Sequence, residues 1–359
     1  MKIGIDVQST QGKLTGIGYY TKNLLENMKI APEIELSYYR YPKETDLNTL
    51  ERIYWENVSL PKLFKKDKPD ILHITGFAGP LATGKTRKIT TVHDLIGMIY
   101  PGNLAPVSRL YWQRWLPARV KNSRLIIAVS EHTKKDVVRL LGVSPDRVRV
   151  TYLAANKSFR YISNRESLYE VLKKYGINSK YILSVGTIEP RKNYVNLIKA
   201  FALHLDKVKK EEIKLVIVGR KGWAYNECLK SAIELGIQRH IIFCDYVNDV
   251  DLPIIYNMAE LFVFPSLYEG FGLPVLEAMC CGVPIICSNT SSIPEVTADA
   301  AVLINPLNIP AMADAIENVM SNVDLRKSLS GKAMRQSSRF SWEKTAQKTI
   351  SVYKEVLGE

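Results

Sequence analysis

"LFVFPSLYEGFGLPVLEAMCCGVPIICS", residues 261–288, sets the fold class of this chain. It begins and ends with short apolar runs typical of buried strands, and residues 274–281 between them have the pattern of a helix. Strands buried on both faces and separated by helices are typical of a parallel sheet covered by helices. The stretch therefore predicts an α/β fold.

The same alternation runs through the rest of the chain. We expect further strands at residues 2–7, 71–75, 88–93, 124–130, 181–186, 214–219 and 240–244. We expect helices at residues 18–29, 131–141, 192–207, 226–236, 274–281 and 310–320. Together they predict two doubly wound, Rossmann-like layers. A length of 359 residues also exceeds what one core usually serves, and we place the boundary between the two domains at residue 165.

Composition indicates a globular protein, with 46% apolar and 24% charged residues. The N-terminus lacks the features of a secretory signal, and no apolar run reaches the roughly 18 residues of a membrane span. We therefore expect a cytoplasmic protein, with attachment to the inner face of the cell membrane as a further alternative. The five cysteines have no C-x-x-C spacing, so we expect reduced core cysteines and no metal site.

Positive charge is concentrated in the first half of the chain. The total is +13, and residues 1–170 carry 27 Lys and Arg against 16 Asp and Glu. This favours an anionic partner, such as a lipid-diphosphate saccharide or an anionic membrane surface. The segments 62–68 and 109–124, the second with Trp112 and Trp115, suit an interfacial role, although the second could equally pack on the sheet. Scattered basic residues without a recognised module argue against nucleic acid.

The loop after residue 266 has the features of an anion site. Pro274 suits the first turn of a helix, so the amides of Gly272 and Leu273 would point to the carboxyl end of the sheet. Glu269 and Glu277 lie on either side and could accept hydrogen bonds from sugar hydroxyls. The plainer alternative is a solvated Glu269 and a Glu277 that only favours the helix N-terminus.

Residues 186–193, "GTIEPRKN", also join a strand to a helix. Arg191 and Lys192 could neutralise a diphosphate there, although such a pair alone is usually a solvated patch. In the first half, His93 and Asp94 follow a strand, where the histidine could donate a hydrogen bond to a substrate or serve only in packing. Residues 15–21, "TGIGYYT", lack the third glycine of a dinucleotide fingerprint, which argues against a dehydrogenase.

Residues 268–296, "YEGFGLPVLEAMCCGVPIICSNTSSIPEV", resemble the signature of the retaining family 4 glycosyltransferases, with the two glutamates at Glu269 and Glu277. The segments "SVGTIEPRKNYVNLIKAF", "FCDYVNDVDLPIIYNMA", "TVHDL" and "GIGYYTKNLL" match the same family, so the resemblance covers essentially the whole chain. It implies a GT-B fold, in which two Rossmann-like domains face each other across a cleft. The expected domains are 1–165 plus 341–359 for the acceptor and 166–340 for the nucleotide sugar, with the last helix crossing back to the first domain.

The resemblance also implies roles for particular residues. Arg191 and Lys192 would meet the diphosphate, in the loop that Gly186 opens, and Glu277 would meet the ribose. Glu269 and His93 would meet the transferred sugar. The remaining donor contacts are expected at Gly16, Arg220, Tyr246, Val247, Phe271, Gly272 and Leu273.

Two positions depart from the family pattern. Thr187 stands where many members have arginine, which shifts phosphate binding towards Lys192. Asp245 stands where many have glycine, which leaves the shape of the base pocket open.

The implied reaction moves a hexose from a nucleotide sugar to an acceptor with the same anomeric configuration. Helix-end amides and the basic pair would stabilise the departing diphosphate, so we expect no metal or other cofactor. The segments "TVHDL" and "GTIEPRKN" resemble those of bacterial mannosyltransferases of surface polysaccharide synthesis. This resemblance favours GDP-mannose over UDP-glucose or another nucleotide hexose. A retaining glycosidase, which needs no phosphate loop, and a non-catalytic nucleotide-sugar sensor are the alternatives of other classes.

Overall fold

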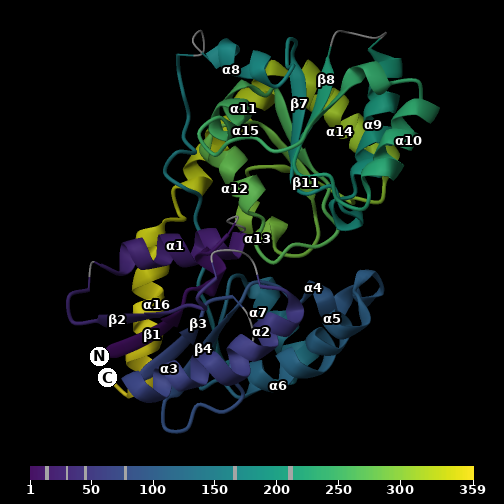
Figure 1. Cartoon of the computed structure of the whole chain (residues 1–359). Coiled ribbons are helices and arrows are strands. Elements are labelled where there is room, and N and C mark those ends of the chain that lie inside the picture. Colours follow the sequence, from purple (N-terminus) through teal and green to yellow (C-terminus); the bar gives the residue numbers. More distant parts are fainter. Residues whose placement is uncertain (13–15, 30, 44–46, 77–78, 165–167, 209–212) are drawn as a thin grey trace. The chain divides into compact units, whose positions relative to one another are not determined.

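The chain folds into two compact units, which are coloured along the sequence in Figure 1. One unit comprises Met1–Ala154 together with Ser341–Glu359, and the other comprises Ala155–Phe340. The computed structural model describes residues 1–12, 16–29, 31–43, 47–76, 79–164, 168–208 and 213–359. We call the two bodies unit 1 and unit 2.

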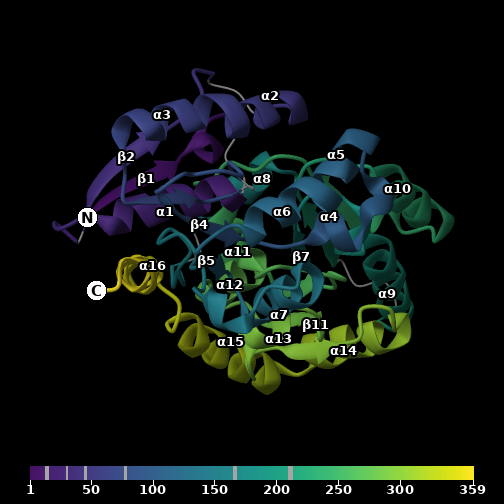
Figure 2. The ribbon, with the colours of Figure 1, turned by 90° about the horizontal axis from the view of Figure 1, so that it is seen from below.

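Unit 1 contains a parallel six-stranded sheet in the order β2-β1-β3-β4-β5-β6. Its strands are β1 (Lys2–Asp6), β2 (Glu35–Tyr39), β3 (Ile71–Ile74), β4 (Arg87–Val92), β5 (Leu125–Ala128) and β6 (Val148–Val150). Its helices are α1 (Gly16–Met28), α2 (Thr49–Tyr54), α3 (Leu60–Asp67), α4 (Ile96–Ile99), α5 (Pro106–Leu110), α6 (Leu116–Lys121), α7 (Glu131–Leu141) and α16 (Trp342–Leu357). Figure 2 shows α3 and α16 on opposite sides of β1, as a doubly wound layer requires.

Unit 2 contains a second parallel six-stranded sheet, in the order β12-β11-β10-β7-β8-β9. Its strands are β7 (Tyr181–Val185), β8 (Lys214–Val218), β9 (Ile241–Cys244), β10 (Leu261–Phe264), β11 (Ile285–Ser288) and β12 (Val302–Ile304). Its helices are α8 (Tyr169–Lys174), α9 (Tyr194–Lys207), α10 (Tyr225–Glu234), α11 (Leu252–Met258), α12 (Leu273–Cys280), α13 (Ile293–Thr297), α14 (Ile309–Ser321) and α15 (Val323–Ser337). The predicted α/β class is therefore confirmed.

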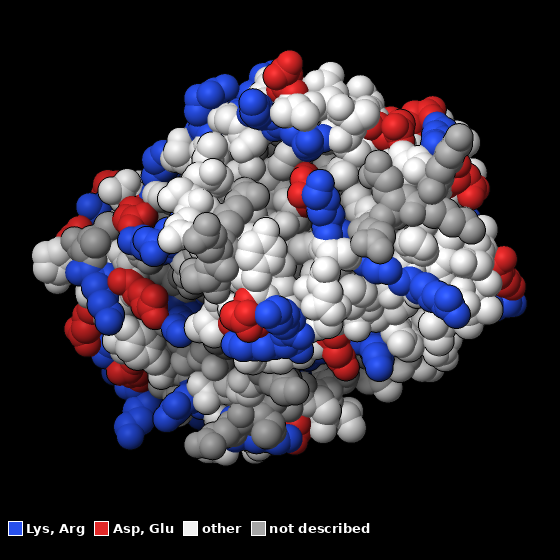
Figure 3. Space-filling view, turned by 90° about the horizontal axis from the view of Figure 1, so that it is seen from above, with Lys and Arg blue, Asp and Glu red and all other residues white. Residues whose placement is uncertain are grey.

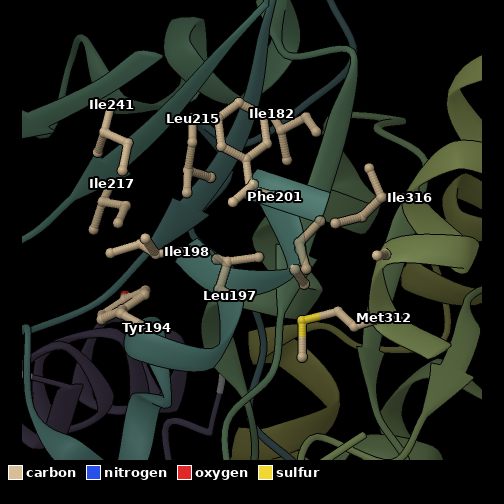
Figure 4. Packing of buried hydrophobic residues seen from close by; sticks show 14 of the residues in the cluster. Ile182, Tyr194, Leu197, Ile198, Phe201, Leu215, Ile217, Ile241, Met312 and Ile316 are labelled. Atoms are coloured by element: carbon tan, nitrogen blue, oxygen red, sulfur yellow. The ribbon is translucent and has the colours of Figure 1, made fainter. Parts of the chain in front are cut away.

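The core of unit 2 lies between its sheet and the helices α9 and α14. Figure 4 shows Leu197 and Phe201 of α9 packed among strand residues such as Leu215, with Met312 and Ile316 of α14 beside them. All five side chains are completely buried. At about 25 cal/mol per Å² of apolar surface removed from water, such packing stabilises the scaffold that carries the loops at the strand ends.

Three strands escaped prediction, and all three lie at sheet edges. They are β2, β6 and β12, with the sequences "ELSYY", "VRV" and "VLI". An edge strand is covered less completely than a central one, so its sequence need not be a continuous apolar run. The prediction relied on such runs and therefore found the interior strands and β9.

The tryptophans proposed for a membrane surface instead pack on unit 1. Trp112 and Trp115 lie against a core cluster with Tyr111 and Leu116, and the Trp112 ring covers Gly97. This segment contains Pro117, and a proline inside a helix usually interrupts it. Residues 106–121 stay helical because a π turn at Tyr111–Trp115 precedes the proline and widens the backbone there.

The first boundary between the units lies about 11 residues before the predicted position, at Ala154. The segment after it is held by unit 2. Asn257 accepts a hydrogen bond from Ile162 N at 2.8 Å and donates one to the Arg160 carbonyl at 2.9 Å. The C-terminal segment belongs to unit 1, where α16 packs against α1.

Charge is mixed on the face drawn in Figure 3, where basic and acidic side chains are interspersed. Among the described residues, no helix is long and apolar enough to cross a membrane.

Candidate functional site

The strand order of unit 2 reverses between β7 and β10, which are neighbours in the sheet. From β7 the chain continues to β8 on one side, and from β10 it continues to β11 on the other. Ligands of open α/β sheets bind at such a point, outside the carboxyl ends of the strands. Residues 186–193 and 265–272, the two loops predicted to bind the donor, leave the sheet there.

The loop after β7 places Lys192 under Gly186. A Cβ on Gly186, whose φ is +147°, would lie 3.1 Å from Lys192 Cε, so glycine leaves room for the lysine. Residues Pro190–Lys192 form a short 3-10 turn, and Asn193 is left-handed with φ +61°. The helix α9 therefore begins at Tyr194 rather than at residue 192 as predicted, because the left-handed residue separates it from the turn.

One oxygen of Glu269 is the meeting point of three donors. Glu269 Oε1 accepts hydrogen bonds from Lys192 Nζ and Ser266 Oγ, each at 2.6 Å, and lies 2.7 Å from Arg191 Nη1. The residue is 9% exposed, so this is a desolvated cluster rather than a surface pair. The solvated-charge alternative for Glu269 is therefore wrong.

Charge within the cluster is balanced before any ligand arrives. Arg191 Nη2 lies 2.5 Å from Glu189, and Nη1 also donates to the Tyr268 carbonyl at 3.0 Å. Burial would raise the pKa of Glu269, but Lys192 and Arg191 outweigh it and hold that pKa below its usual value. Burial also lowers the pKa of Lys192, although Glu269 opposes this shift. The carboxylate is thus ionised, with Oε1 held by three donors, and among the described residues no hydrogen bond to Oε2 is recorded.

The backbone of Glu269 is clamped as well. Its N–H donates to Ser291 Oγ at 3.0 Å, and its carbonyl accepts from Ser292 Oγ at 3.0 Å. Ser291 has φ +54°, a conformation that costs energy outside glycine and is typical of functional loops. These contacts fix the direction of the Glu269 side chain.

The helix α12 presents its N-terminus beside this cluster. Gly272 caps it with φ +99°, and a Cβ there would lie 2.6 Å from Ile293 Cδ1, so only glycine fits. Pro274 occupies the first turn, as predicted. Among the described residues no protein acceptor is recorded for the amides of Gly272 and Leu273. Such amides, at the positive end of a helix dipole, favour an anion.

Glu277 lies on the same helix, half-buried. Tyr256 Oη donates a hydrogen bond to Glu277 Oε2 at 2.9 Å. Burial raises the pKa of Glu277 to about 7, although the Tyr256 hydrogen bond lowers it in part. Ionising this carboxyl group therefore costs stability near neutral pH.

The loop after β8 adjoins the loop after β7, and the loop after β9 adjoins the loop after β8, where Gly219 N donates to the Asp245 carbonyl at 3.1 Å. Ile188 N donates to the Arg220 carbonyl at 3.0 Å, and Gly219 passes so close to Gly186 that a Cβ would lie 2.1 Å from its carbonyl oxygen. Arg220 is exposed, and Tyr246 is 60% exposed. Val247 is buried. The structure thus leaves Arg220 and Tyr246 accessible near the switch point.

His93 belongs to unit 1 and follows β4. Its Nε2 lies 2.8 Å from the Thr75 carbonyl oxygen, which can only accept, so Nε2 carries the proton. Burial lowers the pKa of His93 to about 4, and the ring is therefore neutral. Its Nδ1 can then only accept a hydrogen bond, which corrects the expectation that His93 would donate to a substrate. Gly16 is exposed at the start of α1, and among the described residues beyond its own chain and helix neighbours no atom lies within 4 Å of the place a Cβ would take.

Sequence reasoning missed the residues that hold the predicted ones in place. They are Glu189, Tyr256, Ser266, Ser291 and Ser292. Glu189 and Ser266 lie within the two predicted loops, so their position was a usable signal. Tyr256 and the serine pair come from other segments, and only the tertiary structure brings them to the site.

In the part of the chain that the structure describes, no group of three or more His, Cys, Asp or Glu side chains could hold a metal ion. The five cysteines are free, and four of them are buried.

Comparison with known proteins assigns the family. The model "Glycosyltransferase Family 4" matches residues 32–159, and the model "Glycosyl transferases group 1" matches residues 170–336. O-antigen chain mannosyltransferase B of Escherichia coli is 36% identical over 271 residues, covering 75% of this chain and 70% of that protein. The chain belongs to the group 1 glycosyltransferases.

Other relatives of this glycosyltransferase carry similar names. The serotype-specific mannosyltransferase WbdA of Escherichia coli is 30% identical over 305 residues, which cover 80% of this chain and 37% of that longer protein. HepE of Anabaena, solved with UDP and glucose, has a TM-score of 0.77 and 16% identity over 99% of this chain and 100% of that one. A glycosyltransferase from Rickettsia africae has a TM-score of 0.73 and 18% identity, covering 99% and 98%. These likenesses confirm the GT-B fold.

The raised pKa of Glu277 predicts a pH-dependent stability difference. The ordinary pKa of 4.5 applies to the unfolded chain and about 7 to the folded one, so ionisation destabilises the glycosyltransferase increasingly from pH 4.5 to 7. Glu277→Gln removes this cost. Allowing for partial solvent exposure, we expect the free energy of unfolding of the variant to exceed that of the wild type by about 2 kcal/mol at pH 8. The advantage should shrink towards pH 5 in urea titrations. An advantage that is equal at both pH values would show that Glu277 is not held at a raised pKa.

Proposed function

We propose that this glycosyltransferase transfers mannose from GDP-mannose to a saccharide or a polyprenyl-diphosphate-linked saccharide, with retention of the anomeric configuration. The observation that carries the proposal is the Glu269 cluster, in which one carboxylate oxygen is fixed by Lys192, Arg191 and Ser266 beside the N-terminus of α12. The mannose part is supported by the names of relatives, O-antigen chain mannosyltransferase B and WbdA. A lipid-linked acceptor would place the enzyme at the inner face of the cell membrane.

The phosphates of the nucleotide sugar would bind where backbone amides and basic side chains lie close together. The amides of Gly272 and Leu273 supply hydrogen bonds and the helix dipole, while Lys192 and Arg191 supply charge. Because both cations already face Glu189 and Glu269, the phosphates would share the cations with these carboxylates instead of meeting bare charges. Glu277 would accept hydrogen bonds from the ribose hydroxyls, and the base would lie near Arg220, Tyr246 and Val247.

Glu269 of unit 2 and His93 of unit 1 are each proposed, from the family resemblance, to contact the transferred sugar. Glu269 Oε2 accepts from a sugar hydroxyl, with the amide of Phe271 nearby in the same loop. His93 Nδ1 accepts from a second hydroxyl, which fits its neutral state and its protonated Nε2. Gly16 is proposed, from the family resemblance, as a further contact of the donor phosphates.

The chemistry would break the bond between the anomeric carbon and the phosphate oxygen. Positive charge develops on the sugar ring and negative charge on the leaving diphosphate, and the fixed amides and cations stabilise the latter. The departing phosphate oxygen takes the proton of the acceptor hydroxyl on the same face of the sugar. The residues of the site supply this stabilisation by themselves, and we propose a metal-independent reaction.

UDP-glucose is the second candidate donor, since HepE was solved with UDP-glucose and shares the fold with a TM-score of 0.76. A thermal-shift panel of GDP-mannose, UDP-glucose, GDP and UDP separates the two. We expect stabilisation by GDP and GDP-mannose at micromolar concentration, as mass action requires when a ligand binds only the folded state. Released GDP measured with a saccharide acceptor then separates an enzyme from a sensor. A shift with UDP-glucose alone would reassign the donor, and no shift with any nucleotide would contradict the proposed site.

A further inference from the structure

A chain of hydrogen bonds runs through the interior of unit 1, from the C-terminal helix to α1. Tyr353 Oη of α16 lies 2.6 Å from His73 Nδ1 of β3, and His73 Nε2 lies 2.8 Å from Thr91 Oγ1 of β4. Thr91 Oγ1 in turn lies 3.0 Å from Tyr20 Oη of α1. We call Tyr353, His73, Thr91 and Tyr20 the buried relay. Its step from Tyr353 to His73 alone spans 280 positions in the sequence.

The buried relay is costly unless every group is paired. Tyr353, His73 and Tyr20 are completely buried, and Thr91 is nearly so. Burial lowers the pKa of His73 to about 3, so the relay is neutral. Apolar side chains could fill the same space without a desolvation cost, whereas a paired polar chain fixes the orientation of each ring.

The relay ends against His93. The Tyr20 ring meets the His93 ring edge-on, with centroids 4.8 Å apart and planes at 79°. His93 is also held by the hydrogen bond that its Nε2 donates to the Thr75 carbonyl. Thr75 is fixed within unit 1 in turn, because its hydroxyl donates to the Asp6 carbonyl at 2.8 Å. The imidazole is thus held by one hydrogen bond and by its edge-on contact with the Tyr20 ring.

We propose that the buried relay makes Tyr20 and Tyr353 positioning residues for His93, so that the C-terminal helix sets the direction of His93 Nδ1. The proposal rests on the proposed function, in which Nδ1 accepts a hydrogen bond from the transferred sugar. No relay residue touches substrate. Each acts by holding the next ring in one orientation.

The plain alternative is that Tyr353 only fastens α16 to unit 1. A second bond makes the comparison possible, because Thr345 Oγ1 of α16 donates to the Tyr152 carbonyl at 2.7 Å, outside the relay. Thr345→Val removes that fastening and leaves the relay intact. It is the matched control for Tyr353→Phe, which removes only the hydroxyl and keeps the ring.

The test measures His93 directly in the full-length enzyme. The chain has five histidines, so the His93 imidazole nitrogens can be assigned by NMR of the ¹⁵N-histidine-labelled protein with His93→Gln as reference. We expect wild type and Thr345→Val to show one tautomer, protonated at Nε2. Tyr353→Phe and Tyr20→Phe should shift or broaden the His93 signals and lower kcat about five- to tenfold at unchanged donor KM. The double variant should lose little more, since the two belong to one network.

The outcomes separate the relay from the role of His93. Unchanged His93 signals in Tyr353→Phe, or equal changes in Thr345→Val, would overturn the relay, whatever the activity. His93→Ala with full activity would instead overturn the proposed sugar contact, even if the signals respond to Tyr353→Phe.

Discussion

Glu269→Gln should lower kcat by about 10²- to 10³-fold. The neutral amide of glutamine cannot replace the carboxylate oxygen that accepts from three donors, at a site where charge develops during the reaction. The affinity for GDP should stay the same or increase. In the wild type Glu269 competes with the diphosphate for Lys192 and Arg191, and the variant relieves that competition. The measurements are steady-state rates with GDP-mannose and calorimetric titration with GDP.

The matched control is Ser266→Ala. It removes one of the three donors to Glu269 Oε1 without changing any charge, and kcat should fall only a few-fold, by the roughly 1 kcal/mol of one hydrogen bond. A Glu269→Gln enzyme with near-normal kcat would show that the carboxylate only organises the loop. A large loss of GDP affinity would contradict the competition between carboxylate and diphosphate.

Lys192→Met should weaken GDP binding about 100-fold and lower kcat further. Methionine keeps the packing on the Phe264 ring, whose centroid lies 4.6 Å from Lys192 Nζ, and removes only the charge. It also leaves Glu269 with one cation fewer in a buried place, which costs about 3 kcal/mol of folding stability. Calorimetry and urea unfolding measure the two effects separately.

Two comparisons make this result interpretable. Lys207→Met breaks an exposed pair with Asp314 and should change stability and GDP affinity little. The double variant Lys192→Met/Glu269→Gln removes both charges, so most of the lost stability should return while activity stays absent. Stability that does not recover would show that packing, not charge, causes the loss, and normal GDP affinity in Lys192→Met would remove the lysine from the phosphate site.

The sequence predicted the interior of each sheet better than its edges. Strands such as β7 and β10 have continuous apolar runs because helices cover both of their faces. β2 and β12 carry exposed positions and were missed, although each pairs in register with a predicted neighbour. The helix containing Pro117 shows the same limit, since a local helix-breaking signal was overruled by a π turn and by packing against the core.

The positions of the candidate site residues could be predicted from the sequence, whereas their contacts with one another could not. Glu269, Glu277, Arg191 and Lys192 follow strand ends or begin helices, and this places them at the carboxyl edge whatever the details. The convergence of three donors on one oxygen of Glu269 was not predictable, because Lys192, which supplies one of them, lies 77 residues away along the chain. The tautomer of His93 was not predictable either, since it depends on the carbonyl of Thr75.

The sequence by itself determined the alternation of strands and helices, the loops that we propose to carry the chemistry, and the family of the enzyme. These depend on local patterns, namely apolar runs, helix starts and glycines that must leave space. Such patterns can be read along the sequence without knowledge of the tertiary structure. The tertiary structure alone decided which atoms are paired and which remain available, such as Glu269 Oε1 against Oε2 and His93 Nε2 against Nδ1. Pairing depends on distances between residues far apart in sequence, and burial then magnifies each pairing, because an unpaired polar group in the interior is far more costly than one in water.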